Sequence, residues 1–411
     1  MCAFYLGAGH NPNRYTGNID VAIIDFDGEQ AGKCFLDAFR TTSPGNRTLH
    51  WRYKYPDEYG NSVNTTQQSV NDGEVWAVVV LQPNTTSTIN KSLSALINST
   101  TLVTYPLVNT FPVLVIYDEG RNPFTQNIFV LPPIRAAIAT ANNLYSQTLR
   151  TTIISNLSST SSSSTNRTLQ LQNTLRLRSL LVNPLAIEYN NLHRALPYVG
   201  QFATTIGYIY LFLVTTIMVG STIGILMPFI GKIHYVDLIL CHVLNKIFQS
   251  LMISLIYSLI VLWLFHITSA RQFMQYWMFN WLSTTLLSII VSFFLTNFGA
   301  FANIFLVICV VIMVSGATIQ ISLELSSCFF RYGYGIPLYH VINGGRHLLF
   351  GSYSRFGINV GVLVIYLGMM IIFTVLTIIF WTKKHQQEIR KKENETNMNN
   401  TITDDIITIR L

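Results

Sequence analysis

Charged residues are scarce in this chain. They make up 11% of the 411 residues, whereas hydrophobic residues make up 50% and the mean hydropathy is +0.38. A soluble domain carries about 25% charged residues, so much of this chain must face something other than water. The net charge of +7 is modest for this length, and the basic residues form no stripe interleaved with aromatics, which excludes the usual pattern of a nucleic-acid partner.

Cysteine is also scarce, and two kinds of motif are missing. The five cysteines, Cys2, Cys34, Cys241, Cys309 and Cys328, are too scattered for a disulfide framework, and at most one bridge is expected. The chain lacks the G-x-x-x-x-G-K-[ST] loop, so any ATP-driven activity would need a separate ATPase. No carboxylates, histidines or cysteines are grouped at metal-ligand spacing, and we expect no cofactor and no metal.

One carboxylate pair resembles a catalytic pattern. Asp25 and Asp27 form a D-x-D-G sequence with Gly28, but it closes a short β-branched run, where turn chemistry explains both aspartates. We therefore expect the protein not to be an enzyme. His10 and His193 stand alone in the sequence and are expected at the surface.

The apolar residues gather in the C-terminal half of the chain. About 20 apolar residues suffice to cross a hydrocarbon core of ~30 Å. A soluble protein can bury one such helix, but several in succession predict a membrane-spanning bundle over residues 201–382. The predicted spans are Ile206–Ile230, Leu238–Phe265, Trp277–Leu295, Ala300–Leu323 and Gly357–Trp381.

The first 200 residues read as an α/β domain. Strands are expected at Ile19–Phe26, Val75–Leu81 and Pro112–Tyr117, because these runs are short, β-branched and bounded by turn signals. Apolar residues at helical spacing predict helices in between. The helices are Glu29–Arg40, Thr88–Asn98 and Ile134–Leu157. A Ser-rich insertion at residues 158–165 has nothing apolar to bury and is expected to be exposed.

Asn-x-Ser/Thr triplets indicate the side that this α/β domain faces. Seven lie in the first 200 residues and none lies between Pro197 and Trp381, which predicts an extracytoplasmic domain that is glycosylated. Five crossings then place the tail, residues 383–411, in the cytosol, and its basic start satisfies the positive-inside rule. The seven sites are Asn46, Asn64, Asn84, Asn90, Asn98, Asn156 and Asn166.

Four ionisable residues of the membrane half are candidates for contact with lipid or with a transported molecule. His242 and Lys246 are four residues apart on one face of a span, either as a gate or head-group site or as side chains that extend to the membrane interface. Glu324 is expected to pair with Arg331 or Arg346, and Arg346 is the fourth candidate. Its segment, Cys328–Phe356, is rich in glycine and tyrosine, which predicts short re-entrant or interfacial helices.

A small-xxx-small pattern in the first span suggests a second kind of contact. Gly220 and Gly224 are four residues apart, so they could pack helices or form a homodimer face. The start of the chain, by contrast, lacks the basic and apolar regions of a signal peptide. Its Ala3–Leu6 stretch reads like the end of a membrane helix, so we expect a sixth span in the full protein.

Four ordered landmarks give the chain a resemblance to a known family. They are IDVAIIDFDG at 19–28, EVWAVVVLQPNTTSTINKSL at 74–93, VLVIYDEGRN at 113–122 and GIPLYHVINGGRHLLFG at 335–351. Together they resemble a fungal membrane family named after nitrosoguanidine resistance and, more remotely, bacterial phage-infection proteins. The fourth landmark is also similar to a segment of ABC-2-type permeases. The resemblance implies a plasma-membrane protein with an ABC-2-like bundle, linked to resistance against toxic compounds.

Residues and resemblance together lead to two expectations for function. In the first, the protein moves amphiphilic drugs or lipids, or makes cells tolerant of such toxins. Its partners would be membrane lipids, amphiphilic small molecules, and a separate ATPase or a second copy. In the second, it is a non-transporting plasma-membrane scaffold or sensor that acts through the extracytoplasmic domain.

Overall fold

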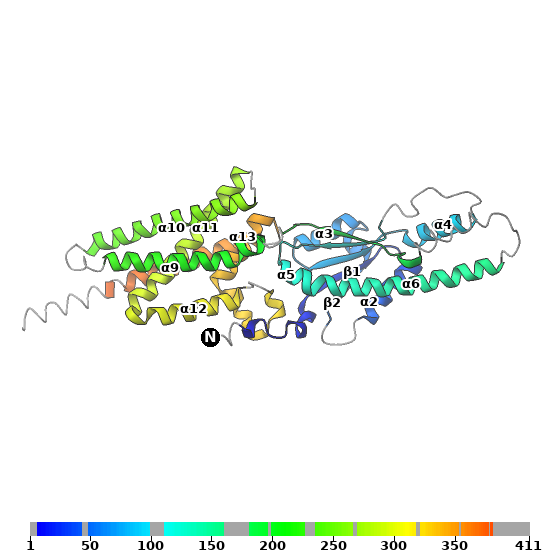
Figure 1. Ribbon diagram of the computed structural model, residues 1–411, viewed down its shortest axis with the longest axis horizontal. Coiled ribbons are helices and arrows are strands. Elements are labelled where there is room, and N and C mark those ends of the chain that lie inside the picture. Colours follow the sequence, from blue (N-terminus) through cyan, green and yellow to red (C-terminus); the bar gives the residue numbers. More distant parts are fainter. Residues whose placement is uncertain are drawn as a thin grey trace, which may run out of the picture. The chain divides into compact units, whose positions relative to one another are not determined.

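The computed structural model describes residues 6–42, 48–98, 111–159, 181–195, 199–226, 235–265, 269–317, 321–352, 355–377 and 379–380. These residues form two compact units (Figure 1). The α/β unit consists of residues 1–204 together with residues 312–356, and the helical unit consists of residues 205–311 and 357–411. Each unit is described by itself below.

A five-stranded sheet in the order β2-β1-β3-β4-β5 forms the centre of the α/β unit. Neighbouring strands are parallel, except that β3 and β4 are antiparallel. The carboxyl ends of β4 and β5 therefore lie at the opposite edge of the sheet from those of β1 and β3. The strands are β1 (Asp20–Asp25), β2 (His50–Lys54), β3 (Ala77–Leu81), β4 (Val113–Tyr117) and β5 (Ile187–Asn191).

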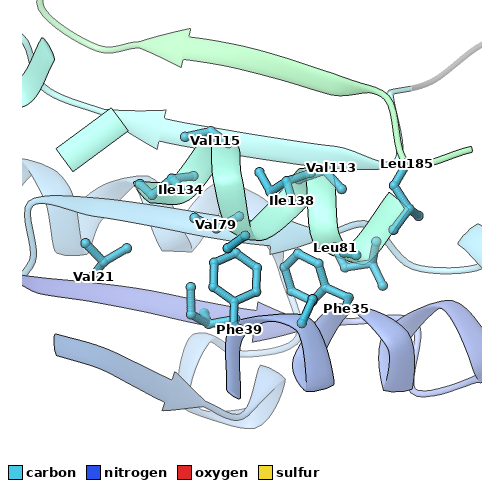
Figure 2. Packing of buried hydrophobic residues seen from close by; sticks show 14 of the residues in the cluster. Val21, Phe35, Phe39, Val79, Leu81, Val113, Val115, Ile134, Ile138 and Leu185 are labelled. Carbon is cyan, nitrogen blue, oxygen red and sulfur yellow. The ribbon is translucent and has the colours of Figure 1, made fainter. Parts of the chain in front are cut away.

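Helices cover both faces of this sheet. Helices α2 (Gln30–Thr41) and α6 (Leu131–Ser159) pack against each other, and residues of both join the larger of two apolar clusters. Figure 2 shows Phe35 and Phe39 of α2 pointing toward β3. Helix α3 (Val63–Asn71) contributes Val70 to the cluster on the other face. Because both faces are covered, β3 can consist of five consecutive buried apolar residues.

The sequence predicted this part of the fold well. All three expected strands and all three expected helices are confirmed, the helix expected at Thr88–Asn98 being α4 (Thr85–Asn98). Strands β2 and β5 and helix α3 were missed. Both strands lie at the edges of the sheet and carry charged or polar side chains, so they lack the apolar run by which an inner strand is detected. Of the expected Ser-rich insertion, residues 160–165 lie outside the described residues.

A segment from the C-terminal half completes the α/β unit. It contains η7 (Leu323–Leu325), η8 (Cys328–Gly335) and α13 (Pro337–Phe350). Leu325 is fully buried in the same apolar cluster as Phe35 and Phe39. Sequence analysis assigned this segment to the membrane bundle, whereas the structure groups it with the α/β domain. We call residues 321–352 the returning segment.

The helical unit contains the apolar helices. Four are long and apolar enough to cross a membrane: α9 (Ile206–Leu226), residues Leu240–Phe265 of α10 (Tyr235–Phe265), α11 (Ala270–Phe298) and the C-terminal helix Phe356–Thr377. The fifth expected span forms the shorter helix α12 (Ala302–Gly316), which has 15 residues. The prediction of five spans is therefore not confirmed by helix length.

These helices bury polar residues and expose apolar ones. On α10, Ser250, Ser254 and Ser258 are at most 2% exposed, whereas Ile256 is 60% exposed and Trp263 is 74% exposed. Such an arrangement would be unfavourable in water, where burial of apolar surface drives folding. In hydrocarbon it is favourable, because the polar groups find partners inside the protein. The helical unit is thus built for insertion into a membrane.

Candidate functional site

A line of polar side chains runs along the buried face of α10. Lys246, Ser250, Ser254 and Ser258 recur every four residues, and each is at most 6% exposed. Residues four apart stack on one face of a helix, so the four form a continuous stripe. This stripe, together with the polar residues of α9 and α11 that contact α10, is called the polar seam.

Hydrogen bonds connect the polar seam across three helices. The Tyr208 hydroxyl of α9 donates to Asn280 Oδ1 of α11 at 3.0 Å, and Asn280 Nδ2 donates to the Ser258 hydroxyl of α10 at 2.9 Å. A second link joins α10 to α9, where Gln249 Nε2 donates to the Thr222 hydroxyl at 2.9 Å. Asn280 therefore joins all three helices through one buried side chain.

Lys246 is the one basic residue of the seam. Two contacts of α10 with α11 lie one turn before and one turn after it: His242 Nε2 with Ser292 Oγ at 3.2 Å, and Ser250 Oγ with Thr285 Oγ1 at 2.9 Å. Lys246 therefore lies on the face of α10 that packs against α11, and it is 6% exposed. Of the two roles predicted for it, extension to the membrane interface does not fit this burial between helices.

No carboxylate of the four candidate spans or of α12 can neutralise Lys246. The four candidate spans and α12 contain no aspartate and no glutamate. Among the described residues, no ion pair involves Lys246. An uncompensated charge inside a membrane protein is costly and marks a functional site by default.

The other two sequence candidates, Glu324 and Arg346, lie in the α/β unit and meet at a residue that sequence analysis did not single out. This residue is Arg121, in the loop that follows β4. Its guanidinium lies 3.6 Å from the Glu324 carboxylate and stacks on Trp76 with 4.0 Å to the ring centroid. The backbone carbonyl of Arg121 accepts a hydrogen bond from Arg346 Nη1 at 3.2 Å. Glu324 thus pairs with Arg121, whereas Arg331 or Arg346 was expected from the sequence.

A second contact holds the same loop. The buried Asp118 carboxylate lies 3.3 Å from His193 Nδ1, and Gly120 N donates to the His193 carbonyl at 2.9 Å. His193 was expected to be an isolated surface residue, and this was wrong because β5 places it beside the end of β4. We call Asp118, Arg121, His193, Glu324 and Arg346 the edge cluster. It fastens the returning segment to the edge of the sheet.

Burial determines the charge of three side chains of the returning segment, Arg346, Tyr334 and Tyr339. Arg346 is 2% exposed, and this burial lowers the pKa of its guanidinium to about 10, so it remains charged at neutral pH. Burial raises the pKa of Tyr334 to about 12, and burial also raises the pKa of Tyr339. The edge cluster therefore contains a cation, with neutral tyrosines nearby.

Asp25 is held by hydrogen bonds of its own turn, whereas Asp27 is held by the start of α4 (Thr85–Asn98). Asp25 Oδ1 accepts from the backbone N–H of Asp27 at 2.9 Å and of Gly28 at 3.1 Å. The Asp27 carboxylate accepts from Thr86 N at 2.9 Å. Burial raises the pKa of Asp25. Turn chemistry therefore accounts for Asp25, as expected, whereas the carboxylate of Asp27 contacts the first turn of α4.

The four apolar helices and the α/β sheet indicate a multi-pass membrane protein with an α/β domain. Residues 1–372 match a protein family described as a protein of unknown function (DUF3533), and the chain belongs to this family. No curated protein and no solved structure matches the chain. The predicted contact of His242, Lys246, Glu324 and Arg346 with lipid or with a transported molecule stays a prediction.

Replacing Gly120 should loosen the returning segment. An alanine Cβ at this position would lie 2.9 Å from the Ser352 Cβ and 3.0 Å from the Phe350 Cβ. We expect Gly120→Ala to lower the free energy of unfolding by about 1–3 kcal/mol, as overpacking does elsewhere. The measurement is thermal unfolding of the purified chain in detergent. Gly335→Ala is the matched control, because its Cβ would meet no atom within 4 Å. Equal melting temperatures for the two variants would contradict the tight packing of Gly120 against the returning segment.

Replacing Lys246 by an apolar side chain should stabilise the helical unit. A charge without a partner inside a membrane helix costs about 2.5–3.5 kcal/mol on insertion scales. Lys246→Met keeps a long side chain and removes this charge, so we expect a gain in stability of about 1–3 kcal/mol. Arg271→Met, at an exposed position of α11, should show no such gain. If Lys246→Met is less stable than the unaltered protein, the lysine has a compensating partner.

Proposed function

We propose that this protein binds amphiphilic molecules inside its membrane helices and moves them between the two leaflets or out of the membrane. The polar seam is the observation that carries this proposal. It offers hydroxyl, amide and ammonium groups along helices whose outer faces are apolar, so a polar head group can be accommodated while its tail remains in lipid. Such a protein would make cells tolerant of toxic amphiphiles, as the resemblance to the resistance family implies.

An energy source is part of the same proposal. The sequence contains no nucleotide-binding loop, so active transport would need a separate ATPase as partner. An ABC-2-like arrangement of the bundle fits this requirement, because permeases of that type work with such a subunit. The open sides of Gly220 and Gly224 on α9, where an added Cβ would meet nothing within 4 Å, are available for a second copy.

A non-transporting scaffold or sensor is the second candidate. It is favoured by the edge cluster, which joins residues that precede α9 to residues that lie between α12 and the C-terminal helix in one folded domain. A ligand bound by the extracytoplasmic domain could then bias the helices without any molecule crossing. In this alternative the polar seam serves only to hold α9, α10 and α11 together.

We further propose that the chain crosses the membrane five times, with the α/β unit outside the cytosol, the C-terminus inside, and the plasma membrane as its location. The α/β unit contains residues before α9 and residues after Ile312. Both junctions must therefore be on one side, and the number of crossings between them must be even. Helices α9, α10 and α11 give three, so α12 must supply the fourth. With η6 (Gly299–Phe301) before it, α12 extends over about 28 Å, and its last turn, from Ile312 on, groups with the α/β unit.

Flux measurements in cells test the transport proposal. Cells with and without the gene are loaded with a fluorescent amphiphilic drug or a labelled phospholipid, and retention is followed with and without ATP depletion. We expect faster loss or inward movement that depends on the protein, and a severalfold slower rate for Asn280→Leu, which breaks the links among α9, α10 and α11. Ile256→Leu, on the exposed face of α10, is the control. Unchanged flux with altered toxin sensitivity would favour the scaffold or sensor.

Glycan mapping tests the orientation. Asn64, Asn84 and Asn90 are exposed in the α/β unit, so we expect glycosidase treatment to increase the gel mobility of the protein made in eukaryotic cells. Replacing all three by glutamine should reduce this shift. Asn394 and Asn399 of the tail also lie in Asn-x-Thr triplets, but they should stay unmodified because the tail is proposed to lie in the cytosol. Glycans on the tail and none on the α/β unit would reverse the proposed orientation.

A further inference from the structure

The charge of Lys246 restricts which molecules the polar seam can hold. The side chain is 6% exposed and lies on the α11-facing side of α10. Its ammonium group brings one positive charge and three hydrogen-bond donors into a region without a carboxylate. Burying such a group is unfavourable unless a negative charge accompanies it. The four candidate spans contain no complementary charge, and Asp237, in the first turn of α10, is exposed and lies nine residues before Lys246.

The groups around Lys246 are suited to an anion. His242 precedes it by one turn and Ser250 follows it by one turn, and both contact hydroxyl groups of α11. Asn245 and Gln249 flank it toward α9, where both amide nitrogens contact the Thr222 hydroxyl at 3.5 Å and 2.9 Å. Hydroxyl and amide groups can share in binding a phosphate or carboxylate without adding a competing negative charge.

The same stretch of α10 has apolar residues on its outer face. Val243, Leu244, Ile247 and Phe248 are 41–61% exposed, within one turn of Lys246. A molecule bound at the lysine would therefore have its charged group among polar side chains and its remainder against apolar ones. A lipid or another amphiphile with an anionic head group combines a charged group with an apolar remainder in this way. A free inorganic anion has no apolar part that could contact the exposed apolar face.

We propose that Lys246, flanked by His242 and Ser250, binds the anionic head group of an amphiphile inside the polar seam. This inference rests on the proposed function and names its substrate class: amphiphiles with a phosphate or carboxylate head group are bound in preference to neutral or zwitterionic ones. A cost in stability at position 246 is then offset whenever the anion is present.

Binding of two labelled lipids tests the proposal. The purified full chain in detergent is titrated with fluorescent phosphatidic acid and, separately, with phosphatidylcholine that carries the same label, and anisotropy is recorded. We expect the unaltered protein to prefer phosphatidic acid by at least about tenfold. Lys246→Gln should remove the preference, and Lys246→Arg should retain most of it, because arginine keeps the charge. Circular dichroism checks that both variants are folded.

Two further arms separate the origin of the charge effect. Arg271→Gln removes an exposed positive charge of α11 and should leave the preference for phosphatidic acid unchanged. If this variant loses the preference as Lys246→Gln does, the preference is due to surface charge and the proposal is overturned. Inorganic phosphate should compete only weakly. If it competes as well as phosphatidic acid, the site binds a free anion and the amphiphile is excluded. An unchanged preference in Lys246→Gln would also overturn the proposal.

Failure of this inference can be told apart from failure of the proposed function. If neutral amphiphiles are moved as fast as anionic ones and Lys246→Gln leaves both rates unchanged, the transport proposal is supported and the proposed head-group preference is contradicted. If phosphatidic acid binds through Lys246 but no amphiphile moves in cells, the proposed binding site is supported and the transport proposal is contradicted. In the second case the bound lipid would be a structural or regulatory ligand of a scaffold.

Discussion

The helical unit depends on one constraint: hydrocarbon offers no hydrogen-bond partner to a polar group. A buried serine, threonine or asparagine of α9, α10 or α11 is therefore favourable only with a partner in its own helix or in a neighbour. The serines and threonines largely donate to backbone carbonyls of the preceding turn, as Thr215 does to Leu211. The larger polar groups cannot do so and meet between helices, and Asn280 is the clearest case because it bonds to both α9 and α10.

This constraint also fixes which face of each helix is outside. Leucine, isoleucine and phenylalanine side chains gain no hydrophobic free energy by packing inward when the surroundings are equally apolar. The polar residues therefore decide the rotation of α10, and the exposed apolar face follows from it. Lys246 is the exception that this logic does not explain. It fits the rotation of the helix, since it continues the line of Ser250 and Ser254, but it has no acidic counterpart.

The sequence predicted the strands and helices better than it predicted the side-chain contacts between distant residues. Periodicity and β-branched runs located the inner strands and the helices of the sheet, because those signals are local. Strand β5 escaped detection, since IEYNN has no apolar run. The pairing of Arg121 with Glu324 joins residues about two hundred positions apart, and no spacing rule reaches that far. The polar seam was partly visible: Lys246, Ser250, Ser254 and Ser258 recur every four residues, but their burial required knowledge of the neighbouring helices.

The returning segment has a consequence for how the chain becomes folded. Leu325 fills part of the main apolar cluster of the α/β domain, and Arg346 binds the carbonyl of Arg121. During synthesis both residues emerge only after α9, α10 and α11 have been made. The core of the α/β domain is therefore completed only after these helices have been synthesised. A chain that ended before Leu325 would leave part of this cluster unfilled and would expose apolar surface of the α/β domain.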